Sequence, residues 1–209
     1  MKLRLASRSL LLLCLAAVPA LADTIYDNGP INGSSDGWTV NFGFIVSNTF
    51  TVGSGGATVN GLEFGAWIFP GDVLLSIEVS ITDSEFGGHT FLDDVVNISQ
   101  TNCVVNQYGF NLCTDVASFP ETHLDAGTYW LNLQNGIVND DPIYWDENSG
   151  PSQASQNSVG TIPSEAFTLL GTNGTSTTGT TGTIPEPTTV MLLGSGILGM
   201  AGLLRRRWF

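Results

Sequence analysis

The segment "LSIEVSIT", residues 75–82, alternates apolar and polar side chains at every position. Successive side chains of a strand point to opposite sides, so one face would carry Leu75, Ile77, Val79 and Ile81. Further strand candidates, bounded by clusters of Gly, Pro, Asn and Asp, cover residues 47–52, 57–69, 89–99, 127–134 and 165–171. Short strands separated by turns predict an all-β fold, an antiparallel β-sandwich of jelly-roll type over residues 23–171.

The charge distribution narrows the classes of partner. All nineteen carboxylates lie between Asp23 and Leu204, and that span contains no Lys or Arg. Nucleic acids and anionic membrane surfaces are bound through basic side chains, so we expect neither as a partner of the body. Salt bridges to Lys or Arg cannot stabilise the fold either. Apolar burial, hydrogen bonds and covalent links must do so, with divalent cations as a further means.

The N-terminal segment has the layout of an export signal. Residues 1–22 begin with scattered basic side chains, continue as an apolar run, and end in Ala20-Leu21-Ala22. Small side chains at these two alanine positions suit signal peptidase, so we expect cleavage after Ala22. The predicted partners for this step are the Sec translocon and signal peptidase.

Two cysteines remain after that cleavage, in the segment "CVVNQYGFNLC". Cys103 and Cys113 are symmetric about Tyr108, so a hairpin with its loop at residues 107–109 would place them opposite each other. Gly109 would then occupy the loop position that requires a left-handed backbone. An even pair of cysteines in an exported protein indicates a disulfide.

The C-terminal part contains a linker and a second apolar segment. Residues 172–184 are rich in Thr and Gly and have the composition of a flexible linker. A short proline motif, an apolar span and a basic cluster follow: Pro185, Glu186 and Pro187, then residues 188–204, then Arg205, Arg206 and Arg207. The span is long enough for a transmembrane helix, and the arginines would keep its end cytoplasmic.

The proline motif, the span and the arginines, in this order at the C-terminal end, resemble the PEP-CTERM sorting signal over residues 185–209. The resemblance implies an exosortase as processing partner in a Gram-negative bacterium that makes exopolysaccharide. It also implies transient anchorage in the membrane, followed by release to the cell surface or extracellular matrix. The body, with "YDNGPINGSSDGWTVNFGF", "GTYWLNLQN" and "YWDENSGPS", is similar to a recurring PEP-CTERM body type of unknown function.

Aromatic side chains recur beside polar ones in the body. Strict alternation groups Trp130 with Asn132 and Gln134, and it groups Tyr144 with Asp146. An aromatic ring next to amides or carboxylates can stack on a sugar ring and hydrogen-bond its hydroxyls. The candidate glycan-binding residues are therefore Trp67, Trp130, Asn132, Gln134, Tyr144 and Asp146. The alternative is that these aromatics fill the interior or cover an open edge.

Motifs for catalysis are weak. The body has two imidazoles, His89 and His123, and no nucleophile elbow, HExxH or EF-hand pattern. Paired carboxylates could serve a glycosidase, but nineteen acids make some pair inevitable. We therefore expect a non-catalytic surface or matrix protein associated with exopolysaccharide. A glycan-binding module is the alternative, and a polysaccharide hydrolase is a further one.

Acidic residues in the predicted turns are candidate ligands for one cofactor, Ca²⁺. Asp140, Asp141, Asp146 and Glu147 carry the hard oxygen atoms that Ca²⁺ prefers. Solvated loop acids are the commoner reading of such residues, so we expect no cofactor, with Ca²⁺ as the alternative.

Overall fold

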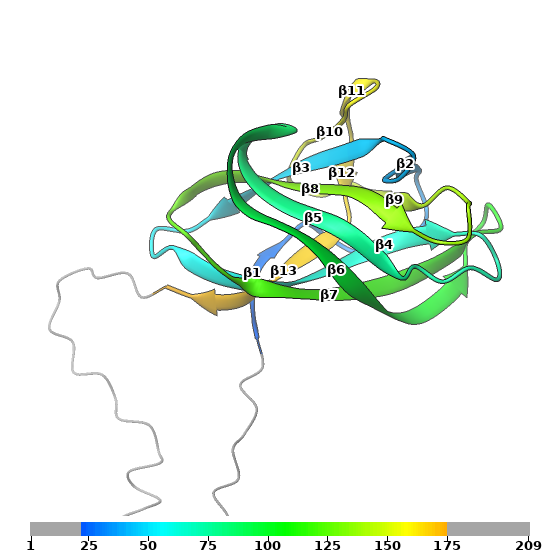
Figure 1. The fold of residues 1–209 in the computed structure, drawn as a ribbon, viewed down its shortest axis with the longest axis horizontal. Coiled ribbons are helices and arrows are strands. Elements are labelled where there is room, and N and C mark those ends of the chain that lie inside the picture. The colour runs from blue at the N-terminus through cyan, green and yellow to red at the C-terminus, as the bar shows by residue number, and fades with distance from the viewer. Residues whose placement is uncertain (1–21, 175–209) are drawn as a thin grey trace, which may run out of the picture. The chain divides into compact units, whose positions relative to one another are not determined.

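The computed structural model describes residues 22–174, and the regular structure of this part consists of β-strands without a helix (Figure 1). The strands are β1 (Asp23–Asp27), β2 (Gly37–Thr39), β3 (Ile45–Val52), β4 (Ala57–Ile68), β5 (Ser76–Ser84), β6 (Gly87–Val105), β7 (Asn111–Leu124), β8 (Gly127–Ile137), β9 (Tyr144–Asn148), β10 (Ala154–Gln156), β11 (Gly160–Ile162), β12 (Ser164–Glu165) and β13 (Phe167–Asn173). The prediction of an all-β, antiparallel fold is confirmed.

The expected signal peptide, most of the linker, the transmembrane span and the sorting signal lie outside the described residues. In residues 22–174 there is no helix long and apolar enough to cross a membrane. The last strand, β13, runs to Asn173, two residues into the segment expected as linker.

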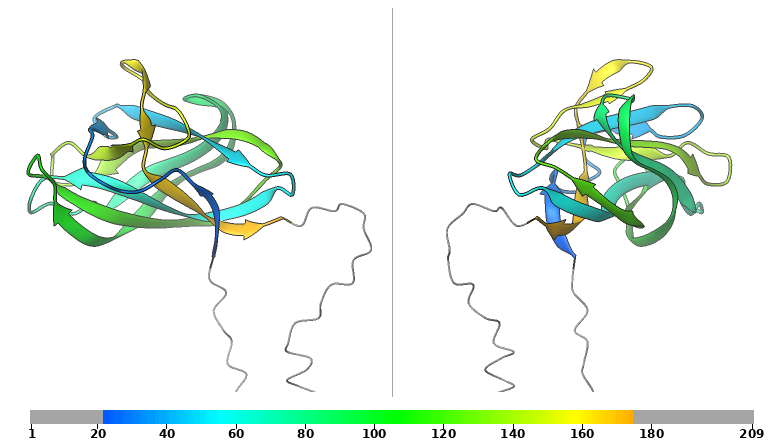
Figure 2. Two further views of the ribbon diagram at one scale, coloured as in Figure 1. Left: turned by 180° about the vertical axis from the view of Figure 1, so that it is seen from behind. Right: turned by 60° about the vertical axis from the view of Figure 1, so that its left-hand side comes forward.

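The strands form one antiparallel sheet that curls over on itself (Figure 2). Its hydrogen-bonded order is β1-β13-β4-β7-β6-β5-β8-β3-β10-β11, with β9 joining β2, β12 and β4 beside this path. The long strand β6 makes the turn, because residues 87–97 pair with β5 whereas residues 98–105 pair with β7. Strands therefore pair in a nested way: β3 with β8, β4 with β7, and β5 with β6.

A single apolar core holds the curled sheet together. Ile77, Val79 and Ile81 of β5 are fully buried, as the alternation predicts. Leu75 is the exception and corrects that prediction, since its side chain is 56% exposed. It precedes the first residue of β5, and its backbone N–H still donates to Ile137 O at 2.9 Å. The backbone of Leu75 is thus hydrogen-bonded to β8, but its side chain lies beyond the end of the apolar core.

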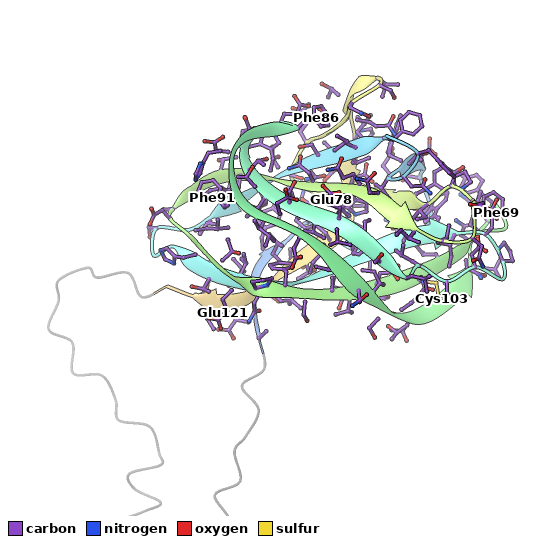
Figure 3. All side chains as sticks on the ribbon, in the orientation of Figure 1. Phe69, Glu78, Phe86, Phe91, Cys103 and Glu121 are labelled. Atoms are coloured by element: carbon purple, nitrogen blue, oxygen red, sulfur yellow. A yellow bond between two sulfur atoms is a disulfide. The ribbon has the colours of Figure 1, made fainter. Side chains whose placement is uncertain are left out.

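The β6–β7 hairpin confirms the predicted disulfide. Cys103 and Cys113 are bonded, with 4.0 Å between their Cα atoms (Figure 3 labels Cys103). Asn106 N–H donates to Phe110 O at 2.8 Å, and Gly109 has the expected positive φ of 87°. The cross-link closes the base of the loop, so the hairpin tip is held as one unit.

Candidate functional site

Seven residues line a pocket of about 360 Å³ at the tip of the β6–β7 hairpin, a volume within the usual range for ligand sites. The lining residues, here called the aromatic pocket, are Ser35, Asp36, Gly37, Trp67, Tyr108, Phe110 and Tyr144. They come from the loop before β2 and the first residue of β2, from β4, from the hairpin tip and from β9. Four aromatic side chains from three separate segments thus share one concavity.

The rings of the aromatic pocket pack on one another. Trp67 and Tyr108 stack with centroids 5.4 Å apart and an angle of 25° between planes. Phe110 packs against both Trp67 and Tyr144, with centroid distances of 5.9 and 5.5 Å. Trp67 is only 3% exposed, whereas Tyr108 is 53% exposed. The stack therefore offers the outer side of the Tyr108 ring to solvent, backed by the buried indole.

Hydrogen bonds join the hairpin tip to the loop that forms the polar rim. Tyr108 Oη–H donates to Ser35 O at 3.0 Å, and Gln107 Nε2–H donates to Ser34 O at 3.0 Å. Asp36, at the rim, is exposed, and its Oδ1 accepts from Gly37 N–H at 2.8 Å. A carboxylate and backbone carbonyls thus stand beside the exposed aromatic ring.

Asp146 lies beneath the aromatic pocket and organises it. This fully buried carboxylate accepts from the backbone N–H groups of Asn32 at 2.9 Å and Gly33 at 3.0 Å, and from Trp67 Nε1–H at 2.7 Å. Burial raises the pKa of Asp146 above its ordinary value, and these three donors oppose that rise. The carboxylate positions both the loop and the indole without lining the pocket.

Gly33 shows how tightly that loop is held. Its φ is +59°, and a Cβ at this position would lie 2.7 Å from Leu112 Cδ2. A larger residue would therefore be strained and would also clash with β7. The sequence "NGPINGSSDG", residues 28–37, contains the loop that Asp146 fixes against the sheet.

The six predicted glycan-binding residues do not form one site. Trp67 and Tyr144 meet in the aromatic pocket, with Asp146 directly beneath Trp67. The other three lie on β8, namely Trp130, Asn132 and Gln134, and none of them lines the pocket. Sequence reasoning missed Tyr108 and Phe110, although an exposed tyrosine at the tip of a disulfide-closed hairpin was an available signal.

The predicted calcium ligands are dispersed. Asp140 and Asp141 line a separate depression of about 350 Å³ beside the β8–β9 loop. Glu147 Oε2 accepts from Trp38 Nε1–H at 2.9 Å, and Asp146 is occupied by its three donors. Within residues 22–174, no group of three or more His, Cys, Asp and Glu side chains is placed to hold a metal ion.

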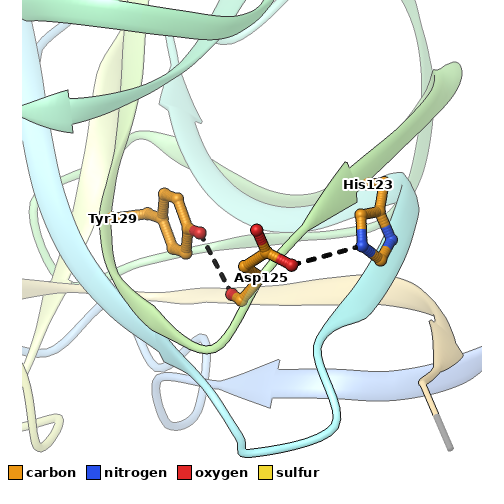
Figure 4. A network of polar contacts seen from close by, with 3 residues as sticks. All are labelled: His123, Asp125 and Tyr129. Carbon is orange, nitrogen blue, oxygen red and sulfur yellow. Dashed lines mark hydrogen bonds and ion pairs between the residues drawn. The ribbon is translucent and has the colours of Figure 1, made fainter.

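The two imidazoles lie outside the aromatic pocket. His123 Nε2 is 3.6 Å from Asp125 Oδ1, and Tyr129 Oη–H donates to Asp125 O at 3.0 Å (Figure 4). Both side chains are largely exposed, so solvent screens this contact and it contributes little to stability. His89 packs edge-to-face on Phe91. Neither histidine is paired with a nucleophile in the described part of the chain.

Comparison with known families identifies the C-terminal signal. Residues 183–207 match the family described as the PEP-CTERM protein-sorting motif. The match includes the Pro-Glu-Pro sequence, the apolar span and the arginine cluster, so the predicted sorting signal is confirmed. Neither the curated proteins nor the solved structures yield a match to the chain. The motif places the chain among exported proteins that an exosortase sorts at the membrane.

Proposed function

We propose that the body is a non-catalytic glycan-binding module, exported and then sorted by an exosortase to the cell surface or matrix, where it associates with exopolysaccharide. The observation that carries the glycan-binding part is the aromatic pocket, in which the exposed Tyr108 ring stacks on the buried Trp67 beside Asp36.

The chemistry of the aromatic pocket suits a neutral sugar. A pyranose ring has an apolar face that stacks on an aromatic ring, and its equatorial hydroxyls need acceptors at the rim. The exposed Asp36 carboxylate supplies such an acceptor next to Tyr108, while the Ser35 carbonyl already accepts from Tyr108 Oη–H. The body has no Lys or Arg to pair with a carboxylated or sulfated glycan, so an anionic ligand is disfavoured.

The fold supports the glycan-binding proposal by analogy. One half of the curled sheet has the order β1-β13-β4-β7 and the other the order β3-β8-β5-β6. We infer that the body is a β-sandwich of jelly-roll type, since nested antiparallel pairs in this order are what a rolled-up ribbon of strands produces. Lectin domains are among the proteins built this way, and the specific argument still rests on the aromatic pocket.

The proposed route uses both ends of the chain. Residues 1–22 would direct Sec export and be removed by signal peptidase. The apolar span 188–204 would then hold the protein in the membrane, with Arg205–Arg207 on the cytoplasmic side, until the exosortase processes the tail. The linker at residues 172–184 would give the body reach from the membrane surface.

Affinity electrophoresis tests the proposed binding. The purified protein runs through gels with and without neutral polysaccharide extracted from the host, beside Tyr108→Ala and Tyr144→Ala variants at equal folded fraction. We expect retardation of the wild type and a loss of most of it in both variants. Phe42→Ala, which removes an exposed aromatic ring elsewhere, is the matched control and should run as the wild type.

Two outcomes would contradict the proposal. Equal retardation of the wild type and the two tyrosine variants would remove the aromatic pocket as the binding site. Absence of retardation would leave a structural matrix role without glycan binding. Incubation with a panel of polysaccharides tests the non-catalytic part, since released sugar would indicate a hydrolase.

A further inference from the structure

A second polar concavity lies on the outer face of β8. Trp130, Asn132 and Gln134 project from this face, and the buried core residues Leu131 and Leu133 alternate with them. Each outer residue has direct neighbours on both sides. On β5 the partners are Thr82, Ser80 and Glu78, and on β3 they are Thr49, Ser47 and Ile45. The central row, Ser80, Asn132 and Ser47, is polar across three adjacent strands.

The end of the β5–β6 hairpin closes over part of this face. A cleft of about 110 Å³ has β5 and β8 side chains as its floor and Phe86, Gly87 and Thr90 of the hairpin as one wall. Asp93 and Ile45 complete the lining. We call this concavity the hairpin cleft. It shares no lining residue with the aromatic pocket, and Figure 3 shows Phe86 well apart from Phe69, the neighbour of Phe110.

Asn132 provides the observation that points to a ligand. Its side chain is 3% exposed and lines the cleft, and its Nδ2 donates to Thr82 Oγ1 at 2.9 Å and Ser80 Oγ at 3.2 Å. Its Oδ1 has no hydrogen-bond partner. A buried amide oxygen without a partner is destabilising, so a ligand group that donates to it is favoured.

The remaining groups of the cleft include two carboxylates, which only accept hydrogen bonds when ionised. Glu78 is held in place by Gln134 Nε2–H at 2.6 Å and Asn135 Nδ2–H at 2.7 Å, and Asp93 is exposed at the edge. Two carboxylates and the Asn132 carbonyl call for a ligand rich in donors. The volume is below the roughly 300–1,000 Å³ of sites for drug-sized ligands, which limits the ligand to one small group.

We propose that the hairpin cleft is a second sugar site, which takes the hydroxyl edge of a single neutral sugar residue with Phe86 beside it. The bridging role rests on the proposed function, because it requires the aromatic pocket to be a first sugar site. With two sites the body is bivalent and bridges two polysaccharide chains. Such a bridge gives an exported protein a mechanical role in a matrix through two weak sites.

Titration with monosaccharides tests the cleft directly. Glucose, galactose and mannose are added separately to ¹⁵N-labelled protein while the side-chain amide signals of Asn132 and Gln134 are followed by NMR. Saturating shifts of both signals and of Gly87 are expected with at least one of the sugars. Asp93→Asn should weaken this binding about tenfold, as expected for loss of one charge-assisted hydrogen bond. Glu121→Gln, which removes an exposed carboxylate on β7, is the matched control and should not.

The outcomes separate the two sites. Absence of saturating shifts, or the same shifts from CaCl₂ alone, would overturn the second site. Bridging is measured as precipitation of the host polysaccharide, which both Asp93→Asn and Tyr108→Ala should reduce at a fixed protein concentration. Undiminished precipitation with Asp93→Asn would overturn bivalency while the aromatic pocket stands. Sugar-induced shifts in the cleft without polysaccharide binding in gels would instead leave the second site and remove the proposed function.

Discussion

Asp115 makes the stability of this domain depend on pH, and one substitution should remove its contribution. The side chain lies on β7 between Phe64 and Gln100 of the neighbouring strands and is fully buried. Gln100 Nε2–H donates to its Oδ1 at 2.8 Å, and its Oδ2 has no hydrogen-bond partner. Burial raises the pKa of Asp115 from 3.8 to about 7, and hydrogen bonding to the Gln100 side chain and to the Ala66 backbone only partly opposes this rise.

The sign and size of the effect follow from that pKa. Between pH 3.8 and about 7, the folded protein holds a proton on Asp115 that the unfolded chain has released. The free energy of unfolding therefore falls as the pH rises through this window. At about 1.4 kcal/mol for each pH unit, roughly three units correspond to a loss of about 4 kcal/mol.

Asp115→Asn keeps the shape of the neutral acid and removes its titration. Urea unfolding followed by tryptophan fluorescence from pH 4 to pH 8 should give similar stability for the wild type and the variant at pH 4. At pH 8 the variant should be more stable, by up to about 4 kcal/mol. Burial also raises the pKa of Glu165, so both proteins keep some slope, and the difference between them isolates Asp115.

Glu121→Gln provides the matched control, because it removes an exposed carboxylate from the same strand. Its pH profile should follow the wild type. Parallel profiles for the wild type and Asp115→Asn over the whole range would refute the reasoning, since the buried carboxyl would then titrate alike in the folded and unfolded chain.

Three further substitutions test other parts of the molecule. Double replacement of Cys103 and Cys113 by Ser should lower the free energy of unfolding by about 3 kcal/mol, because the cross-link closes a short loop; two reactive thiols in the native exported protein would contradict the disulfide. Asp146→Asn should cost about 1–3 kcal/mol by leaving a donor unpaired, measured by urea unfolding, and unchanged stability would argue against its positioning role. Replacement of residues 185–187 by alanine should leave export intact and retain the protein in the membrane fraction; secretion at normal mass would count against the motif.

Local patterns in the sequence predicted much of the strand structure. Alternation identified β5 and β8, and the spacing of Cys103 and Cys113 predicted the hairpin and its glycine turn. These features depend on residues close together in the chain, where side-chain period and turn chemistry are sufficient. The prediction that Leu75 is buried was wrong because alternation does not indicate where the core ends.

The aromatic pocket was predicted only in part, because contacts distant in sequence create it. Trp67 and Tyr144 were expected to bind a glycan, but the rings that complete the pocket come from the tip of the disulfide hairpin. The role of Asp146 depends on the loop at residues 28–36 folding against β9, which no local pattern reports. A pattern of polar alternation cannot distinguish a solvated carboxylate from a buried one that holds a loop.

The most direct test of the account is the distribution of the protein in cultures of the producing cells, measured as the share that co-purifies with extracellular polysaccharide. The wild type and a Tyr108→Ala variant should both be exported and processed. In each case the mature protein should differ in mass from its precursor by the same amount. We expect most of the wild type in the polysaccharide fraction and most of the variant in the free fraction. Equal distribution of the two proteins would contradict the claim that the aromatic pocket binds the matrix glycan.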